Sequence, residues 1–433
     1  MTIAPRIIDY SKYLQKIEDE QVITTIEAKH DVELCKICKL GPKHGGLIRE
    51  YDKDRKSSNY LIIADLIGIF TVGMCPSIPW VLAQSGWLGI LLILWVGWLT
   101  WLGAKYLIDS LYCVPEHRLY DYTSLATHFF GNISGKLMRV VTHFIQICCV
   151  GVLVISMLDN IRLLLINTNN HDFISENFKL SAFIAILVIS IPGYFITSMN
   201  DTALISIINP LNVIIIIIVS IVQCRPNPDL QAPIYSTVQM PTITRGLNLI
   251  LFCFSGILNF PHLERSMKTP KSWNLVSFIG ILLTVISFII IGVLGYWAFG
   301  EHVNINFFEN LPKTWVIPFL TIIVMLQTYS NCLISMILVI DEERIQLAIK
   351  INKIIKKLID VLFFDTFTNL AGSISGVYIS VVFPVAYYIM GYGFKRDWFA
   401  LNGWYMSIML FFGLTVGNYC ICQAILDLTD KLN

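Results

Sequence analysis

Charged residues are scarce in this chain. They make up 14% of its 433 residues, whereas a typical soluble domain contains about a quarter. Hydrophobic residues make up 55%, and this balance argues against a water-soluble enzyme of the same length. The formal net charge is only +1. The chain therefore lacks the basic surface that nucleic acids attract, and we expect no nucleic-acid partner.

Two other common features are missing from the sequence. The first ten residues contain Pro5, Arg6 and Asp9 and have no apolar core, so we expect no cleavable signal peptide. The eleven cysteines lie mostly inside apolar runs, where small apolar packing is their usual role. This placement argues against the disulfide framework of a small secreted protein.

The charged residues that are present cluster at one end. Residues 1–59 hold 21 of the 61 lysine, arginine, aspartate and glutamate residues. We therefore divide the chain into a charged tail, residues 1–59, and a membrane-embedded body, residues 60–433. A short, highly charged tail next to an apolar body is typical of a multi-pass membrane protein with a flexible terminus.

Ten segments of the body are long and apolar enough to span a bilayer, which takes about 20 residues. Each contains at most one acidic or basic residue, and the single acid is Asp65. Because lipid offers no hydrogen-bond partners to the backbone, we expect each segment to be a helix. The segments are 61–84, 87–104, 140–158, 180–200, 202–224, 246–263, 272–300, 314–340, 366–394 and 398–426.

The region 344–364 has apolar residues at helical spacing but also carries four lysines. It fits either an amphipathic helix at the interface or an eleventh span whose lysines snorkel. Basic residues at the end of the tail place the N-terminus in the cytoplasm. Alternation then puts Lys395 and Arg396 on the same side only if this region crosses the membrane. We therefore favour eleven spans.

Two of the segments are interrupted at corresponding places. The first contains Pro76 and Pro79, and the sixth contains Ser255 and Gly256 followed by Pro261. Proline does not fit an uninterrupted helix, although isolated kinks are common in spanning helices. Matched interruptions in two halves of a chain point to a transporter's binding site, where free backbone groups hold a charged solute. The residues expected to contact the substrate are Gly73, Met74, Cys75, Ser77, Cys253, Ser255 and Gly256.

A few polar side chains within the spans are candidates for binding a coupling ion or a proton. Asp65 is a candidate because a carboxylate is rare inside a membrane, although it is also close enough to the tail to be solvated. His143 shares a helix face with Gln146 and can carry a proton near neutral pH, or simply pack through a hydrogen bond. Three residues of the eighth segment offer cation ligands or, alternatively, polar helix contacts: Thr328, Ser330 and Asn331.

Several motifs occur in the order found in one known family. The stretch Pro79-Trp-Val-Leu-Ala-Gln-Ser-Gly-Trp87 is followed by Phe254-Ser-Gly-x-x-x-Phe-Pro261, then by Glu264, and later by the segment 295–301, Gly-Tyr-Trp-Ala-Phe-Gly-Glu. These residues resemble the amino acid/auxin permease family over about residues 60–426. The segment 370–376 is most similar to the vesicular inhibitory amino acid transporter branch.

The resemblance implies an all-α membrane fold of about eleven helices, arranged as a five-plus-five inverted repeat of the LeuT type with helices 1 and 6 broken. It also implies secondary active transport of small neutral amino acids by alternating access, driven by a proton or sodium gradient. No cofactor is implied. The extra Pro76 and the absence of neighbouring glycines depart from the family's glycine-rich first break. The exact substrate, the coupling ion and the membrane, vesicular or plasma, stay open.

Two other classes of function deserve comparison. A non-transporting sensor that kept the same fold would bind an amino acid without moving it. An intramembrane enzyme has little support, because the spans contain no paired catalytic acids, metal-ligand cluster or nucleophile motif. In the tail, Cys35 and Cys38 with flanking histidines are able to bind zinc, but their spacing fits a structural zinc site poorly. We therefore interpret the tail as charged and regulatory, without a metal.

Overall fold

The computed structural model describes residues 57–71, 74–114, 118–165, 203–224, 232–312, 315–340, 373–392, 409–411, 413–423 and 426. These residues are almost entirely helical. The one β-type contact among them is an isolated bridge between Ser57 and Met267. The all-α class predicted from the sequence is therefore confirmed for the described part of the chain. The predicted segments 180–200 and 344–364 lie outside it, as does the tail before Ser57.

The first predicted span is bent, as its prolines predict. It consists of α4 (Asn59–Thr71), the short 3₁₀ helix η1 (Cys75–Ser77) and α5 (Ile78–Ser85). The second part is bent by 48° from the direction of the first at the break. Pro76 and Pro79 occupy the first turns of η1 and α5, where a missing N–H is harmless. The prolines thus start new helices after the break instead of disrupting one.

The sixth predicted span is modified without a comparable bend. It contains α12 (Ile243–Cys253), the 3₁₀ helix η2 (Phe254–Asn259) and α13 (Phe260–Ser266), and the stretch from Ile243 to Ser266 meets the criteria for one spanning helix. The interruption is therefore a local change of helix type. Pro261 again lies in the first turn of the new helix, α13.

Four of the remaining helices have 24 or more residues, a length sufficient to cross a bilayer. They are α6 (Leu88–Leu111), α8 (Asn132–Leu165), α14 (Trp273–Phe299) and α15 (Val316–Ile340). Shorter elements follow or connect them: α7 (Tyr122–Phe130), α11 (Ala203–Gln223), η3 (Pro270–Ser272), η4 (Gly300–His302), η5 (Phe307–Asn310), the π-helix η6 (Ser373–Val382) and α18 (Phe383–Tyr392).

Within the described residues, four helices are long and apolar enough to cross a membrane, and the bent α4–α5 pair makes a fifth. Four shorter apolar helices cover residues 207–223, 316–329, 376–391 and 409–423. Each of these nine coincides with one of the ten predicted segments. The chain is a membrane protein by composition and helix length, although the predicted total of eleven spans extends beyond the described residues.

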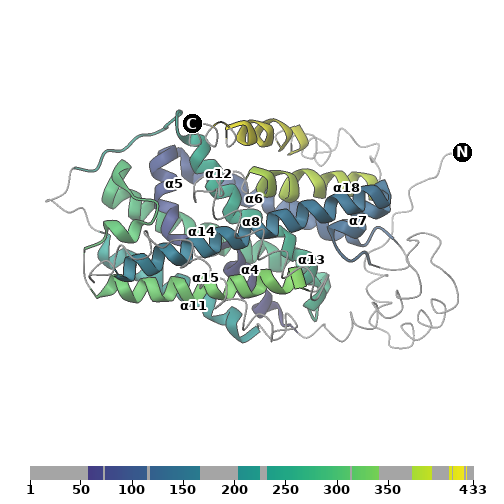
Figure 1. Ribbon diagram of the computed structural model, residues 1–433, viewed down its shortest axis with the longest axis horizontal. Coiled ribbons are helices and arrows are strands. Elements are labelled where there is room, and N and C mark those ends of the chain that lie inside the picture. The colour runs from purple at the N-terminus through teal and green to yellow at the C-terminus, as the bar shows by residue number, and fades with distance from the viewer. Residues whose placement is uncertain are drawn as a thin grey trace, which may run out of the picture.

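The helices pack in two groups. The α8–α15 pair lies on one side, with α7 against α8, and Figure 1 shows these two long helices running side by side. The central group consists of α4, α5, α6, α12 and α14, which pack on one another. Helix α11 contacts α4 and α14 of the central group and also α15. The molecule therefore has two bodies of helices that meet along α4 and η2.

Aromatic side chains fasten the two interrupted spans to each other inside the central group. The Phe70 ring, near the end of α4, has its centroid 5.3 Å from that of Phe254 and 5.8 Å from that of Phe260. Phe260 in turn meets Trp273 edge-on at 5.4 Å. All four side chains are buried. Such edge-to-face contacts favour defined geometry, so the end of α4 and both ends of η2 form one packed unit.

Candidate functional site

A cavity of about 40 Å³ lies where the two helix groups meet, with space for about three water molecules. Its wall includes residues from five elements: α4, α8, α12, η2 and α15. Polar groups alternate with apolar ones in this wall, which suits a small solute with charged ends and a short side chain. The lining residues are Ile69, Gln146, Cys149, Leu153, Phe252, Ser255, Gly256, Leu258, Asn259 and Asn331.

Helix α4 approaches η2 closely at this cavity because Gly256 has no side chain. A Cβ atom at Gly256 would collide with the Cγ2 atom of Ile69. The glycine thus allows the end of α4 and the middle of η2 to touch at the cavity wall. Neighbouring Ser255 is buried, and it lines the same cavity as Cys149 of α8. The interrupted span therefore lines a cavity to which both helix groups contribute.

The predicted substrate residues divide into two sets in the structure. Ser255 and Gly256 line the cavity. Met74, Cys75, Ser77 and Cys253 are buried beside it, at the two interruptions, but are not among its lining residues. Gly73 lies outside the described residues. Ser255 and Gly256 of the sixth-span interruption thus line a cavity between helices, and Ile69 of α4 is the lining residue from the first span. Substrate contact by the predicted residues stays a prediction.

Eight of the ten lining residues were not among the predicted substrate contacts, and they include the polar side chains of Gln146 and Asn259 and the thiol of Cys149. Gln146 and Cys149 lie three residues apart on α8, so they share a face of the helix, and Gln146 is buried. Asn259 ends η2 and precedes α13. A polar residue at the end of the sixth-span interruption was visible in the sequence. The pairing of α8 with η2 was not, because it depends on tertiary packing.

The predicted coupling residues also lie in different places. Asp65 is buried in α4, one turn before Gly68. Thr328 is fully buried, and its hydroxyl donates to the Val324 carbonyl of its own helix at 2.8 Å. His143 is half-buried, with Nδ1 2.7 Å from the Arg139 carbonyl oxygen of its own helix, and it does not line the cavity. Ser330 is part of α15, but its side chain lies outside the description.

A polar cluster surrounds the last turn of α4, next to the cavity. Asn331 donates through Nδ2 to the Gly68 carbonyl at 3.1 Å, and Gln327 donates to the Thr71 hydroxyl. Asn209 of α11 is fully buried against Gly68. Within the described part of the chain, the side-chain oxygens of all three amides have no hydrogen-bond partner. Three amide side chains with such oxygens therefore lie around one helix end.

Metal chemistry is not indicated by the described side chains. Among them, no group of three histidine, cysteine, aspartate or glutamate residues is close enough to hold a metal ion. The tail motif with Cys35 and Cys38 lies outside the described residues. What the site offers instead is a small cavity with hydroxyl, thiol and amide groups, and a second set of amide oxygens beside Asp65. Such groups bind solutes and cations without covalent chemistry.

Comparisons with known proteins identify a family and several relatives. The family described as "Transmembrane amino acid transporter protein" matches residues 56–351. The chain is 23% identical over 376 residues to "Amino acid transporter AVT1H" of Arabidopsis thaliana, covering 80% of this chain and 85% of that protein. It is 24% identical over 247 residues to "Amino acid transporter AVT1C" of the same plant, covering 55% and 43% of the two chains. For "Amino acid transporter AVT1D" the identity is 22% over 336 residues, with 72% and 60% covered.

Proposed function

This chain belongs to the transmembrane amino acid transporter family, and we propose that it is a secondary active transporter of small neutral amino acids. Transport proceeds by alternating access and is driven by a proton or sodium gradient. One observation carries the proposal: the cavity at η2 is lined by the central group on one side and by α8 and α15 on the other. Rocking one group against the other would open such a cavity alternately to each face of the membrane.

The size and lining of the cavity support a small, neutral substrate. A volume of about 40 Å³ favours a short side chain over a long or aromatic one. The lining residues carry no formal charge, so a basic or acidic side chain would be buried without a partner. The backbone groups of the sixth-span interruption, which lines the cavity, would hold the charged ends of the amino acid. Ser255, Gln146 and Asn259 would then contact the rest of the substrate.

The polar cluster at the end of α4 supports ion coupling at a neighbouring site. Asp65 supplies a buried carboxylate, and intramembrane carboxylates typically mark ion or proton pathways. Asn209, Gln327 and Asn331 supply amide oxygens, which are suitable ligands for a hard cation such as sodium. Since Asn331 also lines the cavity, ion binding would be sensed directly at the substrate site. Thr328 and Ser330 lie between Gln327 and Asn331 on α15. His143 is on a different helix, α8.

The experiment that tests this function is uptake into proteoliposomes containing the full-length protein. Labelled glycine, alanine, serine, proline and 4-aminobutyrate would be supplied one at a time, with pH and sodium gradients imposed separately. We expect concentrative uptake of at least one of them under one gradient, abolished when that gradient is collapsed. Binding without flux would support a sensor instead. Absence of both binding and flux for all five would contradict the proposal.

The orientation of the chain is part of the same proposal. The basic residues before α4 place the N-terminus in the cytoplasm by the positive-inside rule. The α6–α7 connection and the α13–α14 turn would then share the cytoplasmic side, because each lies an even number of crossings from the N-terminus. Protease protection of the tail in sealed vesicles of known orientation would test it. Cleavage of the tail from the lumenal or extracellular side only would contradict it.

A further inference from the structure

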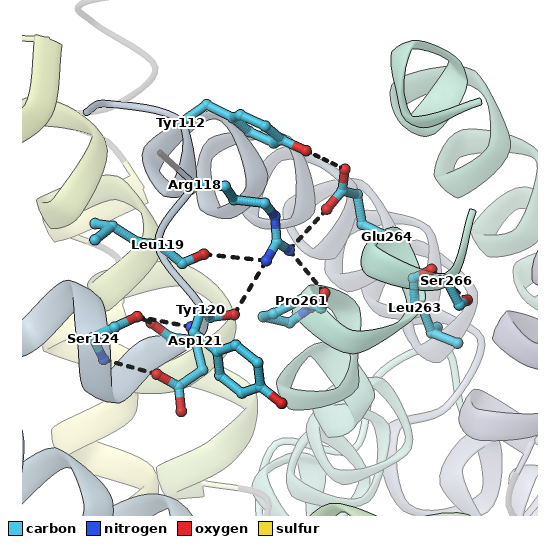
Figure 2. Close-up of polar contacts among 10 residues, drawn as sticks. All are labelled: Tyr112, Arg118, Leu119, Tyr120, Asp121, Ser124, Pro261, Leu263, Glu264 and Ser266. Atoms are coloured by element: carbon cyan, nitrogen blue, oxygen red, sulfur yellow. Dashed lines mark hydrogen bonds and ion pairs between the residues drawn. The ribbon is translucent and has the colours of Figure 1, made fainter. Parts of the chain in front are cut away.

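The connection between α6 and α7 is fastened to α13 by one arginine (Figure 2). The guanidinium of Arg118 forms an ion pair with the carboxylate of Glu264, with Nη2 and Oε2 2.8 Å apart. The same nitrogen donates to the Pro261 carbonyl at 2.8 Å. The other terminal nitrogen, Nη1, donates to the carbonyls of Leu119 and Tyr120 at 3.1 and 3.3 Å. Arg118 therefore shapes its own turn and binds both ends of α13.

The ion pair is buried and has further support. Glu264 is completely buried, and the Arg118 side chain is 7% exposed. The Tyr112 hydroxyl, from the end of α6, donates to the other carboxylate oxygen of Glu264 at 2.5 Å. Removing one partner from a buried pair leaves the other charge without compensation, which is far more destabilising than losing an exposed pair. The pair is thus a strong link between α13 and the connection.

Two neighbouring side chains of α13 strengthen the same contact. Arg265 donates to the Tyr120 hydroxyl at 2.6 Å, and its guanidinium carbon lies 4.9 Å from the centroid of that ring. The His262 ring meets the same tyrosine edge-on at 5.7 Å. Three ionisable side chains of α13 therefore face the α6–α7 connection: His262, Glu264 and Arg265.

On the side facing the start of α4, the hydrogen bonds found among the described residues of α13 and the turn after it are neutral. The Ser57 amide donates to the Ser266 carbonyl at 2.9 Å, and the Lys268 amide donates to the Ser57 carbonyl at 3.0 Å. The Thr269 hydroxyl donates to the Asn59 side chain at 2.8 Å. Neutral bonds of this kind are about half as strong as charge-assisted ones. If α13 separates from a neighbour during transport, it separates from the start of α4 and stays with the connection.

We propose that Arg118 and Glu264 are positioning residues for transport. Their ion pair keeps α13 fixed to the α6–α7 connection. Because η2 runs directly into α13, the position of α13 determines where Ser255 and Gly256 stand at the cavity. Neither member of the ion pair touches the substrate, since neither lines the cavity. The inference rests on the proposed function, and nothing in the sequence resemblance assigns this pair a role.

A double-mutant cycle in the full-length protein tests the inference. Initial rates of labelled-alanine uptake would be measured in proteoliposomes for Glu264→Gln, Arg118→Gln and the double variant, each normalised to the reconstituted amount. We expect each single variant to raise KM about tenfold with little change in maximal rate. The double variant should raise it about tenfold as well, not a hundredfold, because both charges are then absent. Tyr112→Phe, which keeps the ion pair, is the matched control and should change KM less than about threefold.

Other outcomes would overturn the inference. A purely structural role predicts lower abundance with an unchanged KM, and independent roles predict additive effects in the double variant. If Arg118→Gln fails to accumulate, Arg118→Lys keeps the charge and loses the bonds from Nη1 to the connection, so it should raise KM less than Glu264→Gln does. A second readout needs no transport: the rate at which a thiol reagent labels Cys149, measured by peptide mass spectrometry. The rate of Cys149 labelling should change at least about threefold in Glu264→Gln if η2 shifts, and an unchanged rate would overturn the inference.

Failure of the unmodified protein to transport any amino acid would contradict the proposed function. Labelling of Cys149 would still test the role of the ion pair in that case.

Discussion

Asn331 joins α15 to α4 by donating its side-chain amide to the carbonyl oxygen of Gly68 at 3.1 Å, although the two residues are 263 positions apart. Gly68 lies in the last turn of α4, and carbonyls in the last turn of a helix have no intrahelical partner. Asn331 supplies one. The contact connects the bent span of the central group to the α8–α15 pair at the point where the cavity begins.

Replacement of Asn331 by alanine should destabilise this junction. Among the described side chains, the buried Gly68 carbonyl would keep the longer contact from the Thr71 hydroxyl, 3.3 Å, and an under-satisfied buried acceptor costs about 1–3 kcal/mol. The midpoint of thermal unfolding of the detergent-solubilised protein should fall measurably. Thr142→Ala is the control, because that exposed hydroxyl bonds only to its own helix. Equal midpoints for the two variants would show that the contact contributes nothing.

Much of this fold was predictable from apolar length and from proline placement. The bend between Thr71 and Cys75 follows from Pro76 and Pro79, because proline starts helices well and continues them badly. The 3₁₀ helix η2 was predictable as an irregularity from Ser255 and Gly256, but the absence of a large bend was not. Aromatic contacts of Phe70 with both ends of η2 hold that span nearly straight, and such contacts depend on neighbours far away in the sequence.

The site was predictable in part for the same reason. Local sequence identified Ser255 and Gly256, because their effect on the helix is local. It did not identify Cys149 or Arg118, whose roles depend on which helix lies opposite. His143 shows the converse limit: its residue type suggested proton transfer, yet its ring bonds to its own helix. Whether it takes part in coupling stays a prediction.

A side chain at Gly256 should interfere with transport. Gly256→Ala places a methyl group against Ile69 at the cavity wall, and overpacking of this kind costs about 1–3 kcal/mol, so uptake should fall about tenfold. Gly256→Leu should abolish uptake while leaving the amount of protein in the membrane unchanged. Gly292→Ala is the matched control, because its added carbon would lie 3.1 Å from Leu82, away from the cavity. Normal uptake by Gly256→Leu would count heavily against the site.

Asp65 should be required for coupling but not for translocation. Asp65→Asn removes the buried charge that would bind a proton or a sodium ion, so acceleration of uptake by the imposed gradient should fall about tenfold. Exchange of labelled for unlabelled amino acid across the membrane, without a gradient, should persist. Asp65→Glu retains the carboxylate and should retain part of the coupling. A full response to the gradient in Asp65→Asn would exclude this carboxylate from ion binding.

Bound substrate should protect Cys149 from thiol reagents. Cys149 lines the cavity and is partly accessible, whereas its neighbour Cys148 is buried and does not line it. At a substrate concentration ten times the dissociation constant, about one site in eleven is free, so labelling of Cys149 should slow about tenfold. The slow background labelling of Cys148, read from the same peptide, provides an internal control for general changes in conformation.

Protection of both cysteines to the same degree would indicate that substrate acts on the helix as a whole, and protection of neither would place the substrate elsewhere. Cys149→Ser should retain uptake and lose sensitivity to the reagent, because a hydroxyl replaces the thiol beside Ser255 with little change in shape.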